Sequence, residues 1–555
     1  MSQGSISLGR RIATYFHTLR YLKPVQITSR IWRSVYRPPA DSRPAAPLRQ
    51  HSGRWWMCPG HEPQLIELET FRFLNETVVV KGPGDWNSLA HDKLVLYNLH
   101  YFGDLVADGF AERSQWHKAL LERWASENPP TGGNGWESYP LSLRIVNWIK
   151  WALAGGNLST ELLQSLATQA RYLARRPEYH LLGNHLFANA KAMVFAGAFF
   201  SGPEADRMLR AGLQLASSEV REQFLADGGH FERSPMYHSI LTEDLLDLHQ
   251  LGNIYPQAMC GLGTQLLQSI DLASAIGWLH TMSHPDGEIA FFNDAACGIG
   301  LPIARLEQYA NHLGVACRSN EDNALVHLRD SGYVRMHEGR ANVIFDAGAL
   351  GPDYLLAHAH ADTLSFELSL DKRRILVNSG TSTYTGPLRQ WQRGTAAHNS
   401  VTVDQENSSE VWSNFRVARR ARPLDVRVEH NCASAGHDGY RRLSGAPIHR
   451  RMCRLKEDRL LVEDKIEGSG RHDLTICFHA APGLDMKRTG DEWLLCDEGQ
   501  VLARLSPPRG TQSHVVESHY YPRFGVKAPN KTLFATWTGT LPFCGETVIS
   551  WDGNA

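Results

Sequence analysis

The spacing of apolar residues changes once along this chain, near residue 323, and that change limits the folds open to it. From about residue 91 to 322, apolar residues recur every three or four positions, as in SYPLSLRIVNWIKWALAG (138–155), which is typical of amphipathic helices. Beyond residue 323, segments such as LSFELSLDKRRILVNSG (364–380) alternate apolar and polar residues, as strands do. No predicted strand alternates with the helices, which excludes a parallel α/β fold.

The predicted architecture is a multidomain α+β protein. Consecutive antiparallel helices indicate a toroid or a solenoid, and the second half indicates a large antiparallel β-sandwich. A chain of 555 residues is long enough for two or three domains. We expect a basic helical arm, a Pro-rich linker and short strands in 1–90, a helical domain in 91–322 and the sandwich in 323–555. An active site is expected in the cleft between the helices and the sandwich.

The amino-acid composition limits the classes of partner that this chain is expected to bind. A net charge of −1 and a pI of about 7.1 argue against nucleic acid or an anionic membrane as the main partner. The most apolar stretch, ANAKAMVFAGAFFSG, is short and contains Lys191, so it predicts a buried helix and no membrane span. The nine cysteines form no Cys-x-x-Cys pair, which favours reduced thiols. The N-terminus lacks the apolar core of a secretion signal, so we expect a cytoplasmic protein by default, with export by another route left open.

The first chemical cluster is LLGNHLFAN, where Asn184 and His185 stand at the start of an apolar helix. An Asn in this position is also an ordinary helix cap. The pair alone therefore leaves a structural and a functional role open.

The second cluster is SPMYH, in which Tyr237 and His238 follow Ser234 and Pro235. Ser-Pro is a normal helix entry. Adjacent helical residues face different directions, so at most one of Tyr237 and His238 is expected to point into a given site.

The third cluster is LLAHAHADTLSFEL, with His358, His360 and Asp362 ahead of a strand pattern. On a strand, the two histidines would share one face. They could hold a metal together, divide metal binding from proton transfer, or form hydrogen bonds only. A metallo-β-lactamase-type pattern would need a further histidine where Thr363 stands.

The fourth cluster is RQWQRGTAAHNSVTVD, with Arg389, Arg393, His398 and Asn399. Arginines ahead of a strand could bind a carboxylate bidentately. Solvated surface arginines are the alternative.

Taken together, these clusters resemble the heparinase II/III-like polysaccharide lyases, which include heparinases and some alginate lyases. The resemblance rests on Gly-Asn-His, Ser-Pro-x-Tyr-His, His-x-His-Ala-Asp and Arg-x-Thr-x-x-His-Asn-Ser-Val in this order, and it covers roughly residues 90–540. It implies an (α/α) toroid followed by an antiparallel β-sandwich. It also implies a carbon–oxygen lyase that eliminates across a uronic acid in an acidic polysaccharide. The arm YLKPVQITSRIWRSVYRP resembles members associated with bacterial surface-polysaccharide loci.

The resemblance assigns roles to single residues. Asn184 and His185 match the pair that neutralises the uronate carboxylate, while Tyr237 and His358 match the catalytic tyrosine and histidine. Tyr237 could serve as both base and acid, or His358 could be the base and Tyr237 the acid. Further contacts with the substrate are expected from His238, Tyr384, Arg393 and Glu232.

A structural zinc site is also implied by the resemblance. His360 matches its first ligand and His398 its last, but Asn378 stands where the family often has an aspartate. A neutral amide oxygen is a poorer zinc ligand than a carboxylate. A zinc ion and a metal-free hydrogen-bond network therefore both remain open, and no organic cofactor is expected.

Two other functions compete with the lyase. One is a glycoside hydrolase on a helical toroid that uses Asp227 and Glu232 as its paired carboxylates. The other is an inactive glycan-binding protein of a polysaccharide assembly system. The substrate of a lyase could be heparin-like, hyaluronan-like or alginate-like. A bacterial exopolysaccharide or a related glycan is the substrate we expect. The near-neutral charge separately makes a highly sulfated glycan less favoured than one that carries carboxylates only.

Overall fold

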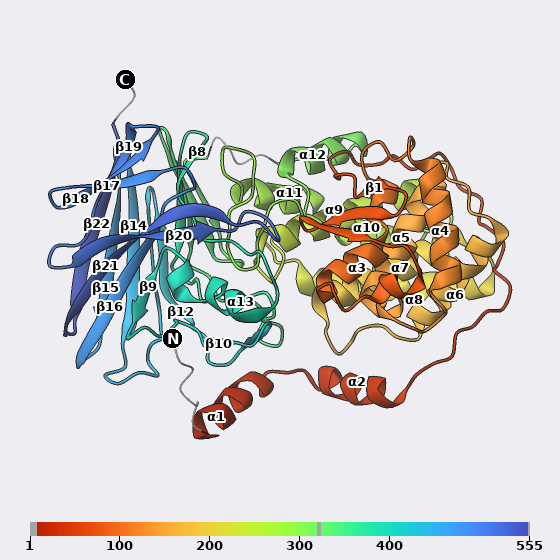
Figure 1. Cartoon of the computed structure of the whole chain (residues 1–555), viewed down its shortest axis with the longest axis horizontal. Coiled ribbons are helices and arrows are strands. Elements are labelled where there is room, and N and C mark those ends of the chain that lie inside the picture. The colour runs from red at the N-terminus through yellow and green to blue at the C-terminus, as the bar shows by residue number, and fades with distance from the viewer. Residues whose placement is uncertain (1–7, 319–322, 553–555) are drawn as a thin grey trace.

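Helices and sheets occupy separate halves of the molecule (Figure 1). The computed structural model describes residues 8–318 and 323–552. The last helix of the helical half, α12 (Ile303–His312), and the first strand of the β half, β4 (Leu325–Leu328), lie on either side of the predicted change of period. Residue 322, where we placed the boundary, lies outside the described residues.

The helical half is organised around one helix that is buried on all sides. Helix α7 (Gly183–Phe199) buries nearly every residue, because its sequence is apolar around its whole circumference. It packs against α5 (Ser138–Leu153) and α8 (Pro203–Gln223). A Cβ on Gly197 would lie 2.4 Å from the backbone nitrogen of Leu209, so α7 and α8 approach as closely as they do only with glycine there.

The remaining helices of this half surround that centre. They are α3 (Lys93–Tyr101), α4 (Ser114–Glu127), α6 (Thr160–Ala174), α9 (Pro235–Ile254), α10 (Leu262–Ser269), α11 (Leu272–Thr281) and α12. No helix in the described parts of the chain combines the length and the apolar content that crossing a membrane requires.

The N-terminal segment comprises two helices at the edge of the molecule and a small sheet that packs against the helical half. It consists of α1 (Leu8–Leu19), α2 (Pro24–Val35) and a small antiparallel sheet of β1 (Leu65–Glu67), β2 (Thr70–Phe73) and β3 (Glu76–Val79). Figure 1 shows α1 and α2 along the lower edge of the molecule, with α1 under the β half. Along the chain the two helices therefore come first and the three short strands follow.

The β half contains three main sheets, all with antiparallel neighbours. Strands β14 and β15 alternate buried and exposed residues, as expected for a sheet with one face in the core. In spatial order, the first sheet is β4, β5 (Tyr333–Glu338), β6 (Ala341–Asp346), β7 (Phe366–Leu370) and β8 (Arg373–Leu376). The second is β20 (Gln512–Tyr520), β21 (Ala528–Thr540), β16 (Arg471–His479) and β9 (Val401–Val403). The third is β12 (Pro423–Glu429), β13 (Cys432–His437), β14 (Ile448–Lys456), β15 (Arg459–Glu467), β22 (Phe543–Ser550), β19 (Gln500–Ser506), β18 (Glu492–Asp497) and β17 (Asp485–Thr489).

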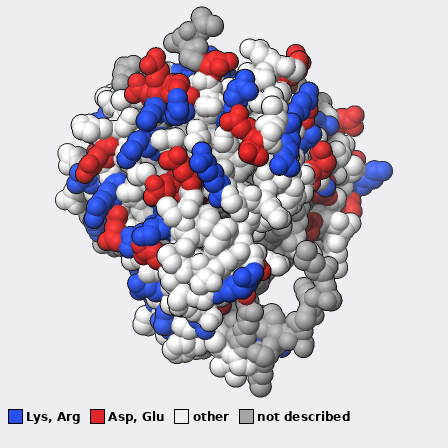
Figure 2. Space-filling view, turned by 90° about the vertical axis from the view of Figure 1, so that its left-hand side faces the viewer, with Lys and Arg blue, Asp and Glu red and all other residues white. Residues whose placement is uncertain are grey.

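Short elements connect these sheets on the side that faces the helices. They are α13 (Gly386–Gln392) and the two-stranded pair β10 (Val411–Trp412) and β11 (Arg416–Val417). The end of the β half that points away from the helices carries acidic and basic side chains interspersed over its upper part (Figure 2).

A buried arginine ties the third sheet to the loops nearest the helical half. Arg451 on β14 forms a bidentate ion pair with Asp464 on β15, at 2.8 and 2.9 Å. Its remaining nitrogen donates to the carbonyl oxygens of Leu364 at 2.7 Å and Asn399 at 2.5 Å. The sandwich core therefore supports the loops that carry the third and fourth sequence clusters.

Candidate active site

The first cluster lies on a tight turn at the start of α7. Leu182 and Gly183 both have positive φ, at 66° and 56°, and a Cβ on Gly183 would lie 2.4 Å from Leu355 Cδ2. Glycine allows the positive φ at this position and leaves the Leu355 side chain where it is, whereas a Cβ would displace that side chain. The turn places Asn184 and His185 in the first turn of α7, beside the segment that precedes the His-x-His sequence.

His185 is held by two groups of the helical half. Its ring stacks on Tyr139 with centroids 4.3 Å apart, and its Nδ1 lies 3.2 Å from Glu178 Oε2. Burial alone would raise the pKa of Glu178, but His185 and nearby cations lower it below its usual value. The His185 side chain is 27% exposed, so its other edge remains open to a ligand.

Tyr237 and His358 form a stacked pair from the two halves of the molecule. Ser234 Oγ accepts a hydrogen bond from Tyr237 N at 3.2 Å and Pro235 follows it, which is why α9 begins here. The Tyr237 and His358 rings are nearly parallel, with centroids 3.9 Å apart. The Tyr237 hydroxyl lies 2.9 Å from the Tyr384 hydroxyl. Burial raises the pKa of Tyr237 well above its usual value, and Tyr384 raises it further, so this phenol is neutral.

Glu232 fixes the orientation of His358. Its Oε2 lies 2.5 Å from His358 Nδ1, and the glutamate is buried. Burial alone would raise the pKa of Glu232, but the attraction of His358 lowers it below its usual value. The carboxylate therefore accepts a hydrogen bond from Nδ1–H, and in the neutral imidazole this tautomer leaves the lone pair on His358 Nε2.

His358 and His360 point in different directions, and the expectation that they share one face is wrong. Strand β7 begins only at Phe366, so the His-x-His segment is irregular and strand alternation does not apply to it. His358 points to Glu232 and the helical half, whereas His360 Nε2 lies 2.8 Å from Asp294 Oδ1 within the β half.

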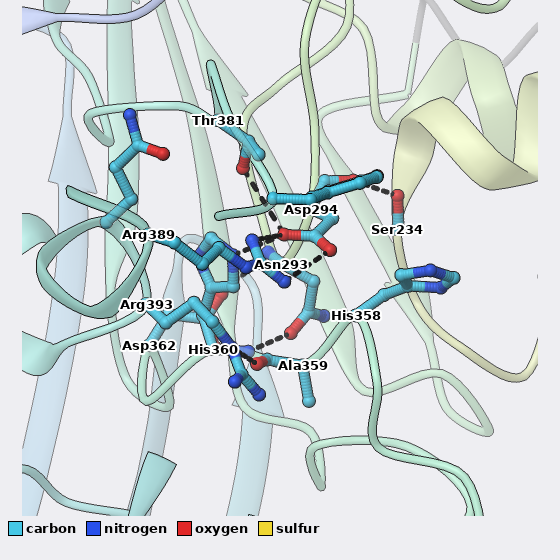
Figure 3. A network of polar contacts seen from close by, with 12 residues as sticks. Ser234, Asn293, Asp294, His358, Ala359, His360, Asp362, Thr381, Arg389 and Arg393 are labelled. Atoms are coloured by element: carbon cyan, nitrogen blue, oxygen red, sulfur yellow. Dashed lines mark hydrogen bonds and ion pairs between the residues drawn. The ribbon is translucent and has the colours of Figure 1, made fainter. Parts of the chain in front are cut away.

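Asp294 is the centre of the polar network that supports this segment (Figure 3). Its buried carboxylate pairs with Arg389 of α13, with 2.8 Å between Nη2 and Oδ2, and with His360. Burial alone would raise the pKa of Asp294, but Arg389 and His360 hold it well below its usual range. The backbone of Asp294 donates to His358 O at 2.9 Å and accepts from Ser234 Oγ. One residue thus links the start of α9 to the His-x-His segment.

Asn293 holds the same segment from its other side. Its Oδ1 accepts from His360 N at 3.0 Å, and its own backbone nitrogen donates to Asp362 Oδ2 at 2.8 Å. Figure 3 shows these contacts around the loop. Asp362 therefore caps a neighbouring backbone group.

Arg393 lies away from the substrate-facing groups, which contradicts the expectation that it binds a substrate carboxylate. Its side chain is fully buried. It donates to Ala359 O at 3.0 Å and to Ser413 O and Asn414 O, both at 3.2 Å. Burial lowers its pKa to about 9. Arg393 binds backbone carbonyls and positions the loop.

His238 is also turned away from the site, contrary to the expected substrate contact. It is fully buried, with Nδ1 accepting from His230 N at 3.1 Å and Nε2 lying 2.8 Å from Ala275 O. A helix rotates by about 100° per residue, so Tyr237 and His238 cannot both face the same group.

The carboxylate pair of the hydrolase alternative does not form. Asp227 Oδ2 accepts from the backbone nitrogens of Asp330 and Ser331 at 2.9 and 2.7 Å, while Glu232 bonds His358. Each carboxylate therefore serves a different loop, and the structure contradicts a paired role for Asp227 and Glu232.

The residues around His360 fit a divalent metal ion. His360 Nδ1 and His398 Nε2 lie 3.2 Å apart, close to the spacing of about 3.3 Å for two nitrogens bound to one tetrahedral zinc. Atoms of His360, Asp362 and His398 all lie within 4.8 Å of one another. Asp294 on the far nitrogen of His360 is the usual outer partner of a metal-binding histidine. Because its ligand atom lies in this group, Asp362 is a candidate for the third ligand. Asn378, the residue expected there, uses its Oδ1 to accept a hydrogen bond from Asn399 N at 3.3 Å.

Several residues of the site were missed in the sequence, namely Tyr139, Glu178, Asn293 and Asp294. The last two stand in FFNDAACG, where a tandem Asn-Asp in an apolar segment was the only available signal. Tyr139 lies one residue into α5, where an aromatic side chain is unremarkable.

Comparisons with known proteins show the family and the fold of the chain. Residues 148–312 match the model "Heparinase II/III N-terminus", and residues 320–552 match "Heparinase II/III-like, C-terminal". A solved structure of heparinase III has a TM-score of 0.63 at 19% identity, covering 82% of this chain and 77% of that one. This similarity confirms the predicted toroid followed by a sandwich.

Two similar proteins carry names that point to different functions. A heparin-sulfate lyase of Bacteroides thetaiotaomicron is 25% identical over 469 residues, covering 73% of this chain and 64% of the relative. FtsZ-localized protein C of Caulobacter vibrioides is 28% identical over 425 residues, covering 70% and 69%. The chain spans less than two thirds of the length of the heparin-sulfate lyases that it matches.

The role of Asp294 can be tested by Asp294→Asn, which leaves the Arg389 guanidinium buried without its counter-charge. We expect the free energy of unfolding to fall by roughly 3–5 kcal/mol, measured by chemical denaturation. Asp286→Asn is the control, because that carboxylate pairs with Arg374 at 2.7 Å but is 29% exposed; there we expect a loss of about 1 kcal/mol or less. Equal losses in the two variants would contradict a central role for Asp294.

Proposed function

Because this chain belongs to the heparinase II/III-like family, we propose that it is a polysaccharide lyase that cleaves an acidic polysaccharide by β-elimination at a uronic acid. The observation that carries the proposal is the Glu232–His358–Tyr237 arrangement: a histidine with an oriented free nitrogen, stacked at 3.9 Å on a neutral phenol. A base and an acid are the two groups that elimination requires.

The uronate carboxylate must be neutralised before its neighbouring C5 proton can be removed. Abstraction of that proton places a second negative charge on the same group, so preorganised donors lower the barrier. Asn184 supplies an amide, and the exposed edge of His185 supplies a second donor. Because Nδ1–H donates to Glu178, His185 can donate to the substrate carboxylate from Nε2 only as the imidazolium, and the proposal requires that form.

The proton transfers follow from the protonation of the two central residues. His358 Nε2 takes the C5 proton, the electron pair forms the C4–C5 double bond, and the C4–O4 bond breaks. The Tyr237 hydroxyl gives its proton to O4, and Tyr384 stabilises the resulting phenolate by hydrogen bonding at 2.9 Å. The raised pKa of Tyr237 suits an acid better than a base. This assigns His358 as the base and Tyr237 as the acid.

Stacking of the two rings also favours one stereochemistry. Because the rings lie nearly parallel at 3.9 Å, both groups approach the sugar from one side. The proposed substrate is therefore a uronate whose C5 hydrogen and O4 lie on the same face, as in glucuronate, within a bacterial exopolysaccharide or a related glycan. A panel of glucuronate- and iduronate-containing glycans tests this, because elimination creates an unsaturated uronate that absorbs ultraviolet light. Faster cleavage next to iduronate would contradict the assignment.

A second candidate function is a non-catalytic role. It is favoured by the relative from Caulobacter vibrioides, which is named for its localisation with FtsZ and whose alignment covers 70% of this chain and 69% of the relative. The intact site favours the lyase, because a non-catalytic protein has no need of an oriented His358 and a neutral Tyr237. Absence of ultraviolet-absorbing products with every glycan of the panel would favour the second candidate.

The acid role predicts the effect of Tyr237→Phe. This variant keeps the ring that stacks on His358 and removes only the hydroxyl, so we expect a folded protein with kcat lower by roughly 100-fold or more. Tyr440→Phe is the control, because it removes another buried hydroxyl, bonded to Val401 O at 2.6 Å in the sandwich. Near-normal turnover in Tyr237→Phe would refute the assignment.

The orienting role of Glu232 predicts that Glu232→Gln lowers kcat by roughly 100-fold or more, because the amide can donate to Nδ1 and favour the tautomer without a free Nε2. Glu307→Gln is the matched control, since Glu307 Oε1 lies 2.5 Å from His280 Nε2 in a similar pair between α11 and α12. We expect it to keep full activity. Similar losses in both variants would show a general effect on stability.

We further propose that His360 and His398 hold a zinc ion in the β half, with Asp362 as third ligand. When bound, the ion would brace the loop between His358 and β7 and take no part in proton transfer. Asp362 takes the place of Asn378 in this proposal, because a carboxylate oxygen is a better zinc ligand than a neutral amide oxygen and the ligand atoms of His360, Asp362 and His398 lie within 4.8 Å of one another.

The zinc proposal is tested by thermal unfolding with and without added zinc. An ion that binds only the folded state raises the midpoint by mass action. We expect a rise in the wild type, a loss of that rise in His398→Ala, and a smaller rise in Asp362→Asn. Elemental analysis of each variant gives the metal content. If Asn378→Asp raises zinc content while Asp362→Asn leaves it unchanged, Asn378 is the third position. No zinc in any variant would favour a metal-free hydrogen bond between the histidines.

A further inference from the structure

The N-terminal arm, defined here as α1 and α2, has a charge unlike that of the rest of the chain. The first 40 residues hold seven of the 57 Lys and Arg residues and none of the 58 Asp and Glu residues, so the remaining chain carries a net charge of −8. The overall value of −1 hides this separation. A cationic segment on an otherwise acidic protein indicates an anionic partner for that segment.

The arm is also the main exposed apolar surface. Nine of the 21 exposed large apolar side chains in the described part of the chain lie in these two helices. Six of these side chains form one row on each helix, because they are three or four residues apart and so lie on one face. On α1 the row is Ile12, Phe16 and Leu19, which are 62, 59 and 47% exposed, and on α2 it is Ile27, Ile31 and Val35, which are 47, 63 and 72% exposed.

The opposite faces of both helices bind the body of the protein. On α1, Thr18 Oγ1 donates to Val417 O at 3.3 Å and accepts from Trp412 Nε1 at 3.0 Å. On α2, Arg33 donates to Arg176 O at 2.9 Å, and Gln26 is buried. Each helix is therefore fixed by polar contacts on one side while its apolar row faces outward, the reverse of an ordinary surface helix.

We propose that the arm docks on an anionic membrane surface, with the two apolar rows entering the interface between headgroups and acyl chains. Basic amphipathic helices with aromatic residues bind lipid in this way, since burial of the apolar row and attraction of Lys and Arg to anionic headgroups act together. Trp32, which is 57% exposed, supplies an amphipathic ring that favours this depth. No membrane-spanning helix is needed for such binding.

Charge distinguishes this partner from a second copy of the chain. An isologous dimer through the arm would bring the same cations of both copies together, and repulsion between them would oppose it. A protein partner would need an acidic surface with matching apolar pockets, which a lipid surface does not. The lipid surface is the partner that accepts two separate apolar rows without shape complementarity.

The test is co-sedimentation of the full-length protein with vesicles of phosphatidylcholine alone or mixed with phosphatidylglycerol. We expect binding to the mixed vesicles, little binding to phosphatidylcholine, and weaker binding as salt is raised. Phe16→Asp on α1 and Ile31→Asp on α2 should each weaken binding by roughly tenfold or more. Leu89→Asp is the control, because Leu89 is 99% exposed but lies outside the arm, and it should bind as the wild type does.

Thermal unfolding shows whether all variants are folded, since each substitution is at an exposed position. The proposal is overturned if the protein binds neither vesicle, or if Phe16→Asp and Ile31→Asp both bind as the wild type does. It is also overturned if the protein ignores vesicles but sedimentation velocity shows a dimer that both substitutions dissociate, because the apolar rows would then join two copies. Lyase activity plays no part in these measurements.

Discussion

The candidate site depends on one buried ion pair, Asp294 with Arg389. A carboxylate taken out of water is unstable unless a cation and hydrogen-bond donors compensate it, and here Arg389 and His360 do so. The same residue uses its backbone to bind the start of α9 and the His358 segment. Charge compensation inside the β half thereby determines where a histidine and a tyrosine from different halves of the chain meet.

Much of the architecture could be predicted because it follows from local periodicity. The change from a helical to an alternating pattern sets the two halves, and Gly183 and the Ser234–Pro235 pair mark the helix starts that carry Asn184 and Tyr237. Such signals lie within a few residues of the groups they place. Side-chain direction is different, since it depends on what packs against the element. His238 was assigned to the substrate, but it lies against Ala275 of α11.

Two further errors have the same origin. In the sequence, Arg393 resembled a residue that binds a carboxylate. In the folded chain it donates to backbone carbonyl groups of distant residues, which the sequence does not reveal. Strand alternation suggested a common face for His358 and His360, but the strand begins later, and the irregular segment separates the two rings. Asp294 could not be found at all, because its partners are 66 and 95 residues away and no local pattern records such distances.

The attachment of the arm also constrains how the two halves can move. Helix α1 is bonded to β11 of the sandwich through Val417, and α2 is bonded to the helical half through Arg176, with only a short turn between them. If the halves separated on this side, one of these contacts would have to break. Separation on the opposite side leaves both intact. The arm therefore ties the two halves together on one side, and under the proposed function a glycan would enter between them from the side that the arm does not cross.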